Sequence, residues 1–105
     1  MARKRRGVDA VKYERSDPIP RHQCPCCDYV TLVERFGWDI CPVCFWEDDG
    51  DYIDALDTRS PANHMTLRQG RANFKEFGAC EKSMVKNVLS VSQRKRYTYL
   101  PRDIT

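Results

Sequence analysis

The sequence has little of several features that commonly reveal a protein's function. It has only two histidines, and neither stands beside a nucleophile or an acid pair in a recognisable catalytic pattern. It has no apolar segment at its start, which is instead the basic run Arg3–Arg6. A secreted disulfide-bonded domain would need such a segment, so the six cysteines favour reduced thiols in the cytoplasm. We therefore expect neither an enzyme nor a membrane protein, and no catalytic residue.

Four of the six cysteines form two Cys-x-x-Cys pairs, Cys24 with Cys27 and Cys41 with Cys44, and 13 residues separate the pairs. Zinc holds four thiolates at about 2.3 Å, so each pair must aim both sulfurs at one point. Two intervening residues allow the tight turn that this needs, and in both pairs a proline after the first cysteine pre-sets φ for it. The spacing predicts one closed tetrahedral site with these four cysteines as ligands and a single structural zinc ion.

Other uses of these pairs remain open. Iron is the closest competitor to zinc, because rubredoxins carry the same paired knuckles, and it would indicate an electron-transfer protein. A thioredoxin-like redox motif would need a helix after the pair. Strand-like residues follow the first pair here and acids follow the second, so this redox chemistry is disfavoured.

The remaining cysteines are Cys26 and Cys80. Cys24 with Cys26 is an alternative ligand pair, but Cys24 with Cys27 mirrors the second pair and is preferred. We predict that Cys26 and Cys80 are small buried apolar residues, with a reactive thiol at Cys26 as the alternative. A second metal site that combines His22 and His64 with Cys26 and Cys80 has no supporting spacing, and nothing in the sequence argues for a Cys80–His64 dyad.

Charge divides the chain into segments. Residues 1–22 carry a net +4, residues 23–58 a net −8 and residues 59–105 a net +7. We predict a basic N-terminal arm over 1–22, the cysteine domain over 23–80 and a basic C-terminal extension over 81–105. Segregated charge of this kind favours either internal complementarity or separate interaction surfaces.

The 13 residues between the pairs are predicted to form a hairpin. Residues 29–33 are β-branched and aromatic, as in a strand, and residues 38–40 alternate as a short return strand. Large aromatic side chains in and beside this hairpin are expected to shield the metal from water. They are Tyr29, Phe36, Trp38, Phe45 and Trp46.

A helix is predicted from about Leu67 to Phe77. Thr66 and Gln69 match a capping box at its start, and Gly78 marks its end. Phe74 and Phe77 should pack on the hairpin, whereas a second face carrying Arg68, Arg71 and Lys75 is expected to be solvated. Residues 79–88 are predicted to form a second short helix. The fold class is thus a small metal-stapled α+β domain: a zinc-ribbon-like β-hairpin with one main helix.

Three linked motifs resemble the bacterial CPCC cysteine-rich domain family. They are Cys24-Pro-Cys-Cys27, the run from Cys41-Pro-Val-Cys to Gly50, and residues 71–79, Arg-Ala-Asn-Phe-Lys-Glu-Phe-Gly-Ala. The resemblance covers residues 23–80 and implies this fold without implying a biochemical activity. Phe45 follows the second knuckle, where rubredoxins usually have glycine. We therefore expect the second turn to depart from the ideal knuckle.

Function is predicted from charge and from the closed site. The leading hypothesis is a non-catalytic zinc module that mediates a protein–protein interaction and neutralises a basic partner through acids such as Asp48, Asp49 and Asp51. The alternative is nucleic-acid binding through the basic termini, where residues 93–100 interleave basic and aromatic side chains. The partner and the oligomeric state are not specified by the sequence.

Overall fold

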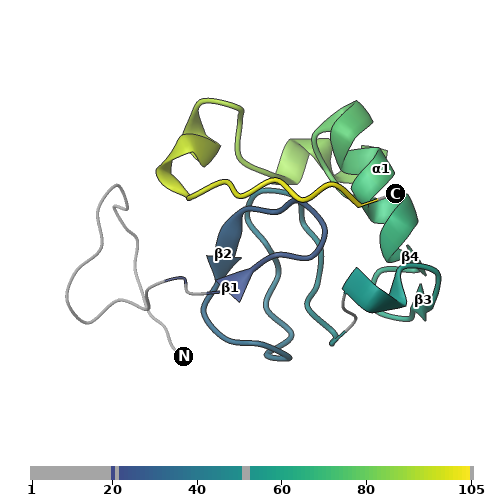
Figure 1. The fold of residues 1–105 in the computed structure, drawn as a ribbon. Coiled ribbons are helices and arrows are strands. Elements are labelled where there is room, and N and C mark those ends of the chain that lie inside the picture. The colour runs from purple at the N-terminus through teal and green to yellow at the C-terminus, as the bar shows by residue number, and fades with distance from the viewer. Residues whose placement is uncertain (1–19, 21, 51–52, 105) are drawn as a thin grey trace.

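The computed structural model describes residue 20, residues 22–50 and residues 53–104. Most of the predicted N-terminal arm therefore lies outside the described residues. So does Asp51, one of the acids predicted to bind a partner. Within the described ranges the chain folds as a small α+β domain with two short antiparallel sheets and one α-helix (Figure 1). The predicted fold class is confirmed.

Each Cys-x-x-Cys turn closes its own short antiparallel pairing. Strand β1 (His22–Gln23) pairs with β2 (Val30–Leu32) across the first turn, and Ile40 pairs with Glu47 across the second. The prediction that residues 29–33 pair with residues 38–40 is therefore wrong. A tight turn holds its own flanking residues at pairing distance, so each turn pairs the chain on its two sides before the longer loop can do so.

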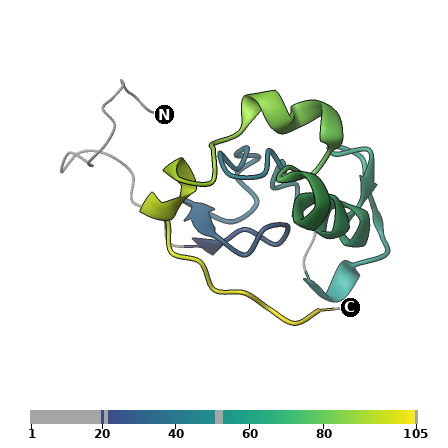
Figure 2. The ribbon, with the colours of Figure 1, turned by 90° about the horizontal axis from the view of Figure 1, so that it is seen from above.

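The free edge of the first hairpin is covered by the C-terminal segment. Tyr29 forms a bridge with Tyr99, the Val30 N–H donates to the Thr98 carbonyl over 2.8 Å, and the Leu100 N–H donates to the Asp28 carbonyl over 3.1 Å. The segment drawn in yellow then runs on toward α1 (Figures 1 and 2). The predicted boundary at residue 80 follows composition; in space the two parts are in contact.

Helix α1 (Leu67–Phe77) has the predicted bounds. A second hairpin, β3 (Arg59–Ser60) with β4 (Met65–Thr66), leads into it. The Thr66 hydroxyl accepts from the Gln69 N–H over 3.1 Å, and the Gln69 side chain accepts from the Thr66 N–H over 2.8 Å, so the capping box is confirmed. Gly78 ends the helix at φ 88°, a conformation that glycine adopts without a steric penalty.

The helix packs on the second knuckle through its smallest side chain. Leu67 and Gly70 are buried, and a Cβ added to Gly70 would lie 2.7 Å from the ring of Trp46, which is 1% exposed. Only a residue without Cβ permits this approach, so α1 covers the metal-binding half of the domain directly. Phe74 lies at the margin of the same core.

Three short 3-10 helices complete the described part of the chain. They are η1 (Ile53–Ala55), η2 (Lys82–Asn87) and η3 (Gln93–Arg96). The second short helix expected over residues 79–88 is thus the 3-10 helix η2. Figure 2 shows η2 and η3 following α1 around the cysteine turns.

Candidate metal centre

The two cysteine turns have the same backbone geometry. In the first, the Asp28 N–H donates to the Cys24 carbonyl over 3.0 Å; in the second, the Phe45 N–H donates to the Cys41 carbonyl over 2.8 Å. The residue after each pair is left-handed, with φ 71° at Asp28 and φ 74° at Phe45. The expected departure at Phe45 is therefore wrong.

The second turn accepts this strain because its surroundings fix it. The Cys41 N–H donates to the Trp46 carbonyl over 2.9 Å, and the Phe45 ring packs against the buried core. A left-handed bulky residue costs about 1–2 kcal/mol, which burial of an aromatic ring can offset. Both turns thus present two sulfurs toward one point.

The sulfur atoms of all four predicted ligands lie within 4.8 Å of one another. Cys24 Sγ is 3.6 Å from Cys44 Sγ, and Cys27 Sγ is 3.7 Å from Cys41 Sγ. A tetrahedron with metal–sulfur bonds of about 2.3 Å places its sulfurs about 3.8 Å apart, whereas a disulfide bond is about 2.05 Å long. The cluster therefore fits a tetrahedral metal ion and could hold one.

The thiol cluster is buried, so its thiols ionise only where hydrogen bonds or an opposite charge compensate for the loss of water. Burial raises the pKa of Cys24 and of Cys44 well above the ordinary thiol value. Burial alone would also raise the pKa of Cys41, but hydrogen bonds from the other three thiols and from Thr31 outweigh it and hold that pKa well below the ordinary value. Four thiolates this close repel each other strongly, so a bound divalent cation is what would let all four ionise together.

Thr31 is a part of the site that the sequence reasoning missed. Its hydroxyl lies 3.0 Å from Cys41 Sγ, and the residue is 7% exposed. A hydroxyl that donates to a ligand sulfur orients that ligand and lowers its basicity. The strand alternation of residues 29–33 could have indicated an inward position for Thr31, but not its partner, which comes from the other knuckle.

Asp28 links the first knuckle to two distant arginines. Arg71 donates to both of its carboxylate oxygens over 2.8 and 3.0 Å, and Arg102 donates through Nε and its backbone N–H, each over 2.8 Å. Burial raises the pKa of Asp28, but the hydrogen bonds from Arg71 and then Arg102 hold it below its usual value. Arg71 is 6% exposed, so the predicted solvated face is wrong at this residue, because it supplies the charge that Asp28 needs.

The same two arginines hold the backbone of the knuckle. Arg71 Nη1 donates to the Pro25 carbonyl over 2.6 Å, and Arg102 Nη2 donates to the Cys24 carbonyl over 2.9 Å. Residues from α1 and from the C-terminal segment therefore fix the turn that carries two of the candidate ligands.

Cys26 and Cys80 lie outside the ligand cluster. Cys26 is 3% exposed and its sulfur lies beside Gly70 of α1, while Cys80 is 4% exposed. Both are buried, as predicted. Burial raises the pKa of Cys80 to about 12, which is the opposite of what an activated nucleophile requires.

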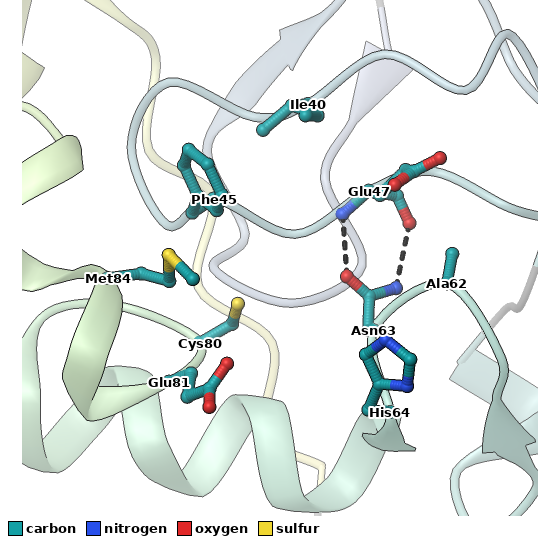
Figure 3. A pocket seen from close by; sticks show the side chains of 9 residues that line it. All are labelled: Ile40, Phe45, Glu47, Ala62, Asn63, His64, Cys80, Glu81 and Met84. Carbon is teal, nitrogen blue, oxygen red and sulfur yellow. Dashed lines mark hydrogen bonds between the residues drawn. The ribbon is translucent and has the colours of Figure 1, made fainter.

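Cys80 and His64 line the same cavity of about 110 Å³ beside the second knuckle (Figure 3). No hydrogen bond between their side chains is found among the described residues. The hydrogen bonds drawn in Figure 3 join Asn63 to Glu47, whose N–H and carbonyl both bind the Asn63 side chain, over 2.8 and 2.9 Å. The side chain of Asn63 is therefore fixed to the backbone of Glu47 at this cavity. The Cys80 and His64 side chains that also line it do not form a dyad.

The predicted aromatic shield divides into two groups. Trp46 is buried, and Tyr29 and Phe45 pack against the core, as expected. Phe36 is 51% exposed and Trp38 is 60% exposed, so the shielding prediction is wrong for both. They belong to the loop of residues 33–40, which lies between β2 and the second cysteine turn.

Of the acids predicted to bind a partner, Asp48 and Asp49 are hydrogen-bonded within the domain. Asp48 is fully buried and its Oδ2 accepts from the Phe36 N–H over 2.8 Å, and Asp49 accepts from the Ser60 hydroxyl over 2.5 Å. Asp48 is therefore not available to a partner, contrary to the expectation that it contributes to an acidic docking surface. Its carboxylate fixes the conformation of the neighbouring loop.

The fold and the four-sulfur cluster together define a metal-binding module of the zinc-ribbon-like kind. The model of a family described as Cysteine-rich CPCC matches residues 22–95. The chain therefore belongs to this family, and the match continues past residue 80, where the recognised motifs end. Neither the curated proteins nor the solved structures that were compared contain a match. No helix of the described residues is long and apolar enough to cross a membrane.

Proposed function

We propose that this protein is a non-catalytic zinc module whose loop 33–40 docks a protein partner. The observation that carries the proposal is a display of large apolar side chains on a loop held in place by buried groups. These side chains are Val33, 41% exposed, Phe36, 51%, Trp38, 60%, and Ile40, 49%. Exposed apolar residues gathered on one segment are typical of protein-interaction sites.

The loop is held in a strained conformation. Phe36 and Trp38 both have positive φ, 61° and 62°, which costs about 1–2 kcal/mol at each bulky residue. Buried Asp48 stabilises this strained conformation: its side chain accepts from the Phe36 N–H, and its carbonyl accepts from the Trp38 N–H over 3.1 Å. Strain maintained in this way is characteristic of functional segments.

The backbone of Gly50 lies against the Phe36 ring of the same loop. A Cβ at Gly50 would lie 2.6 Å from the Phe36 ring, and its φ of 101° favours glycine. One face of the ring therefore rests on the backbone while the residue stays half exposed. The loop presents preformed aromatic side chains, which reduces the entropy that a partner must lose on binding.

Charge indicates the chemistry of the partner. Residues 23–58 contain nine acids and one basic residue, Arg35, and Glu34 and Asp39 of the loop itself are exposed. A tetrathiolate site with a divalent ion would add a charge of −2. The partner that fits is a protein surface with apolar side chains flanked by lysines or arginines.

Zinc is proposed as the metal on ligand chemistry. Four thiolates with no other donor are typical of structural zinc, and all four positions being filled by protein leaves none for a substrate. Iron would fit the same sulfur distances. All six cysteines are free thiols, which supports a reducing compartment such as the cytoplasm.

Nucleic-acid binding through the basic termini receives no added support. Of the aromatic residues in the C-terminal segment, Tyr97 packs against the core and Tyr99 stacks on Tyr29 with ring centroids 4.6 Å apart. These rings already serve internal packing. Binding whose affinity fell steeply with salt would favour nucleic acid over the protein partner.

The test is capture of binding proteins with the zinc-loaded chain as bait. Replacing Phe36 and Trp38 together by serine should abolish specific capture, because interface aromatics typically contribute about 2 kcal/mol or more each. The matched control replaces Val85 and Val91, exposed by 44% and 67% elsewhere, and should capture as wild type does. Equal capture by wild type and the loop variant would contradict the proposal.

A further inference from the structure

The C-terminal segment 98–102 lies along the edge of β2 in the way that a bound peptide does. The bridge between Tyr29 and Tyr99 is antiparallel, and the Thr98 carbonyl accepts from the Val30 N–H over 2.8 Å. Figure 2 shows the segment, in yellow, on the outside of the domain. Adding an extended strand to a sheet edge is a recurring way in which proteins bind peptides.

Two side chains of the segment make specific contacts with the first knuckle. The Tyr99 ring stacks on Tyr29, with ring centroids 4.6 Å apart. Arg102 Nε donates to the Asp28 carboxylate over 2.8 Å, and Arg102 Nη2 donates to the Cys24 carbonyl over 2.9 Å. The edge therefore recognises an aromatic residue that is followed three positions later by an arginine.

The segment buries little apolar surface of its own. Tyr99 is 50% exposed and Leu100 is 52% exposed, and Thr98 and Pro101 are exposed as well. Its detachment therefore loses mainly hydrogen bonds, which water can replace. A segment attached in this way opens at a lower free energy than the core around the cysteine cluster.

Detachment of the segment does not leave a buried charge unpaired. Arg71 donates to both carboxylate oxygens of Asp28, over 2.8 and 3.0 Å. The Arg71 side chain is 7% exposed, whereas that of Arg102 is 30% exposed. Asp28 thus has one partner buried in the domain and one that can leave, so opening avoids the large cost of an isolated buried carboxylate.

We propose that the edge of β2 is a docking site for an extended peptide of a partner protein, and that segment 98–102 is an internal ligand that blocks it. The peptide carries an aromatic residue for Tyr29 and, three positions later, an arginine for Asp28. It displaces the segment and takes over its backbone pairing. This site does not depend on the loop 33–40.

The direction of the pairing relates this site to that loop. Because the pairing is antiparallel, the part of the peptide that precedes its aromatic residue runs toward Leu32, the residue before the loop. A partner already held by the loop, under the function proposed above, presents its peptide at a high local concentration. A free second copy of the chain has no such advantage over the attached segment.

The experiment uses the full, zinc-loaded chain carrying Tyr99→Ala and Arg102→Ala, a release variant that weakens the segment and leaves the edge of β2 unchanged. The probe is the acetylated and amidated peptide Tyr-Thr-Tyr-Leu-Pro-Arg-Asp-Ile, the sequence of residues 97–104. The peptide should shift the ¹H–¹⁵N signal of Val30 saturably in the release variant. It should bind wild type at least about tenfold more weakly, because the attached segment competes. The same peptide with alanine at its third and sixth positions should bind neither.

Two further variants serve as controls. Val91→Ala with Lys95→Ala changes two exposed residues outside the segment, and this chain should bind the peptide as weakly as wild type does. Adding Phe36→Ser and Trp38→Ser to the release variant should leave peptide binding unchanged. Failure of the loop proposal is thereby distinguished from failure of this one.

Four results would overturn the proposal. The release variant could lose its fold, which would make the segment part of the core, or it could fold and not bind the peptide. Wild type could bind the peptide as tightly as the release variant does, or the alanine peptide could bind equally well. A wild-type dimer that the release variant does not form would identify a second copy as the occupant and would also overturn the assignment to a partner protein.

Discussion

Asp28 is the residue on which the arrangement of the first knuckle depends. Its backbone adopts the left-handed conformation that the turn requires, and its carboxylate pairs with two arginines that also bind the knuckle's carbonyl groups. Aspartate and asparagine tolerate positive φ better than most residues. The side chain therefore meets a conformational and an electrostatic requirement together.

Replacing Asp28 by asparagine separates these two requirements. Asparagine keeps the left-handed backbone but removes the charge, which leaves Arg71 buried without its counter-ion. We expect the free energy of unfolding of the zinc-loaded protein to fall by about 3–5 kcal/mol, measured by denaturant titration. Asp57→Asn is the control: Asp57 pairs with Arg68 through a carboxylate that is 73% exposed, so its stability should match wild type. A similar small effect from both changes would contradict a structural role for the Asp28 pair.

Single residues in this chain differ in how far the sequence reveals them. The ligand cysteines follow from local spacing, because a tight turn fixes both sulfurs within four residues. The burial of Arg71 does not, since its partner Asp28 is 43 residues away and the amphipathic pattern of α1 suggests a solvated cation. Asp28 follows the first cysteine pair as Phe45 follows the second. The argument that the residue after a pair needs positive φ therefore also predicts a left-handed backbone at Asp28.

At the scale of elements, the contact between α1 and the second knuckle is set by Gly70. Gly70→Ala should improve helix propensity by about 1 kcal/mol, yet the added methyl group meets the buried Trp46 ring. We expect a net loss of about 1–2 kcal/mol in the free energy of unfolding.

The control for this prediction lies two residues further along the helix. Ala72 is exposed, and Ala72→Gly should lose about 1 kcal/mol through propensity alone. Both changes should therefore lower the thermal midpoint, although their effects on propensity are opposite. A stabilised Gly70→Ala protein would show that the helix can move away from Trp46.

Helix and strands were predictable to different extents for a physical reason. The bounds of α1 follow from a capping box and a terminal glycine, which act within one turn of the helix. Strand pairing depends on which segments the tertiary structure brings together, so the partner of residues 29–33 could not be read from their own composition. Residues 38–40 have strand-like alternation, but they pair across the second knuckle.

At the scale of the whole molecule, the metal centre is expected to carry much of the stability. Structural zinc in small domains contributes about 10–16 kcal/mol of apparent folding free energy, and the described core is built around the cysteine cluster. Purified protein should contain one zinc per chain and no iron. Chelation at neutral pH should unfold it, and the emission of buried Trp46 should shift to longer wavelength.

The corresponding control uses a cysteine outside the cluster. Cys80→Ala should retain zinc and its folded spectrum, whereas Cys44→Ser should lose both. Since Trp38 is already exposed, a Trp38→Phe background isolates the Trp46 signal. A folded spectrum that survives complete metal removal would contradict the structural assignment of the site.

The ion pair between Asp28 and Arg102 also has a consequence for the order of folding. The sulfur contacts join residues only 14 and 20 positions apart, whereas this ion pair joins residues 74 positions apart. Closing a short loop costs less entropy than closing a long one, so metal capture belongs early in folding and docking of the C-terminal segment late. During synthesis the four cysteines leave the ribosome well before Arg102 does. A growing chain can therefore bind its metal first and close over it afterwards.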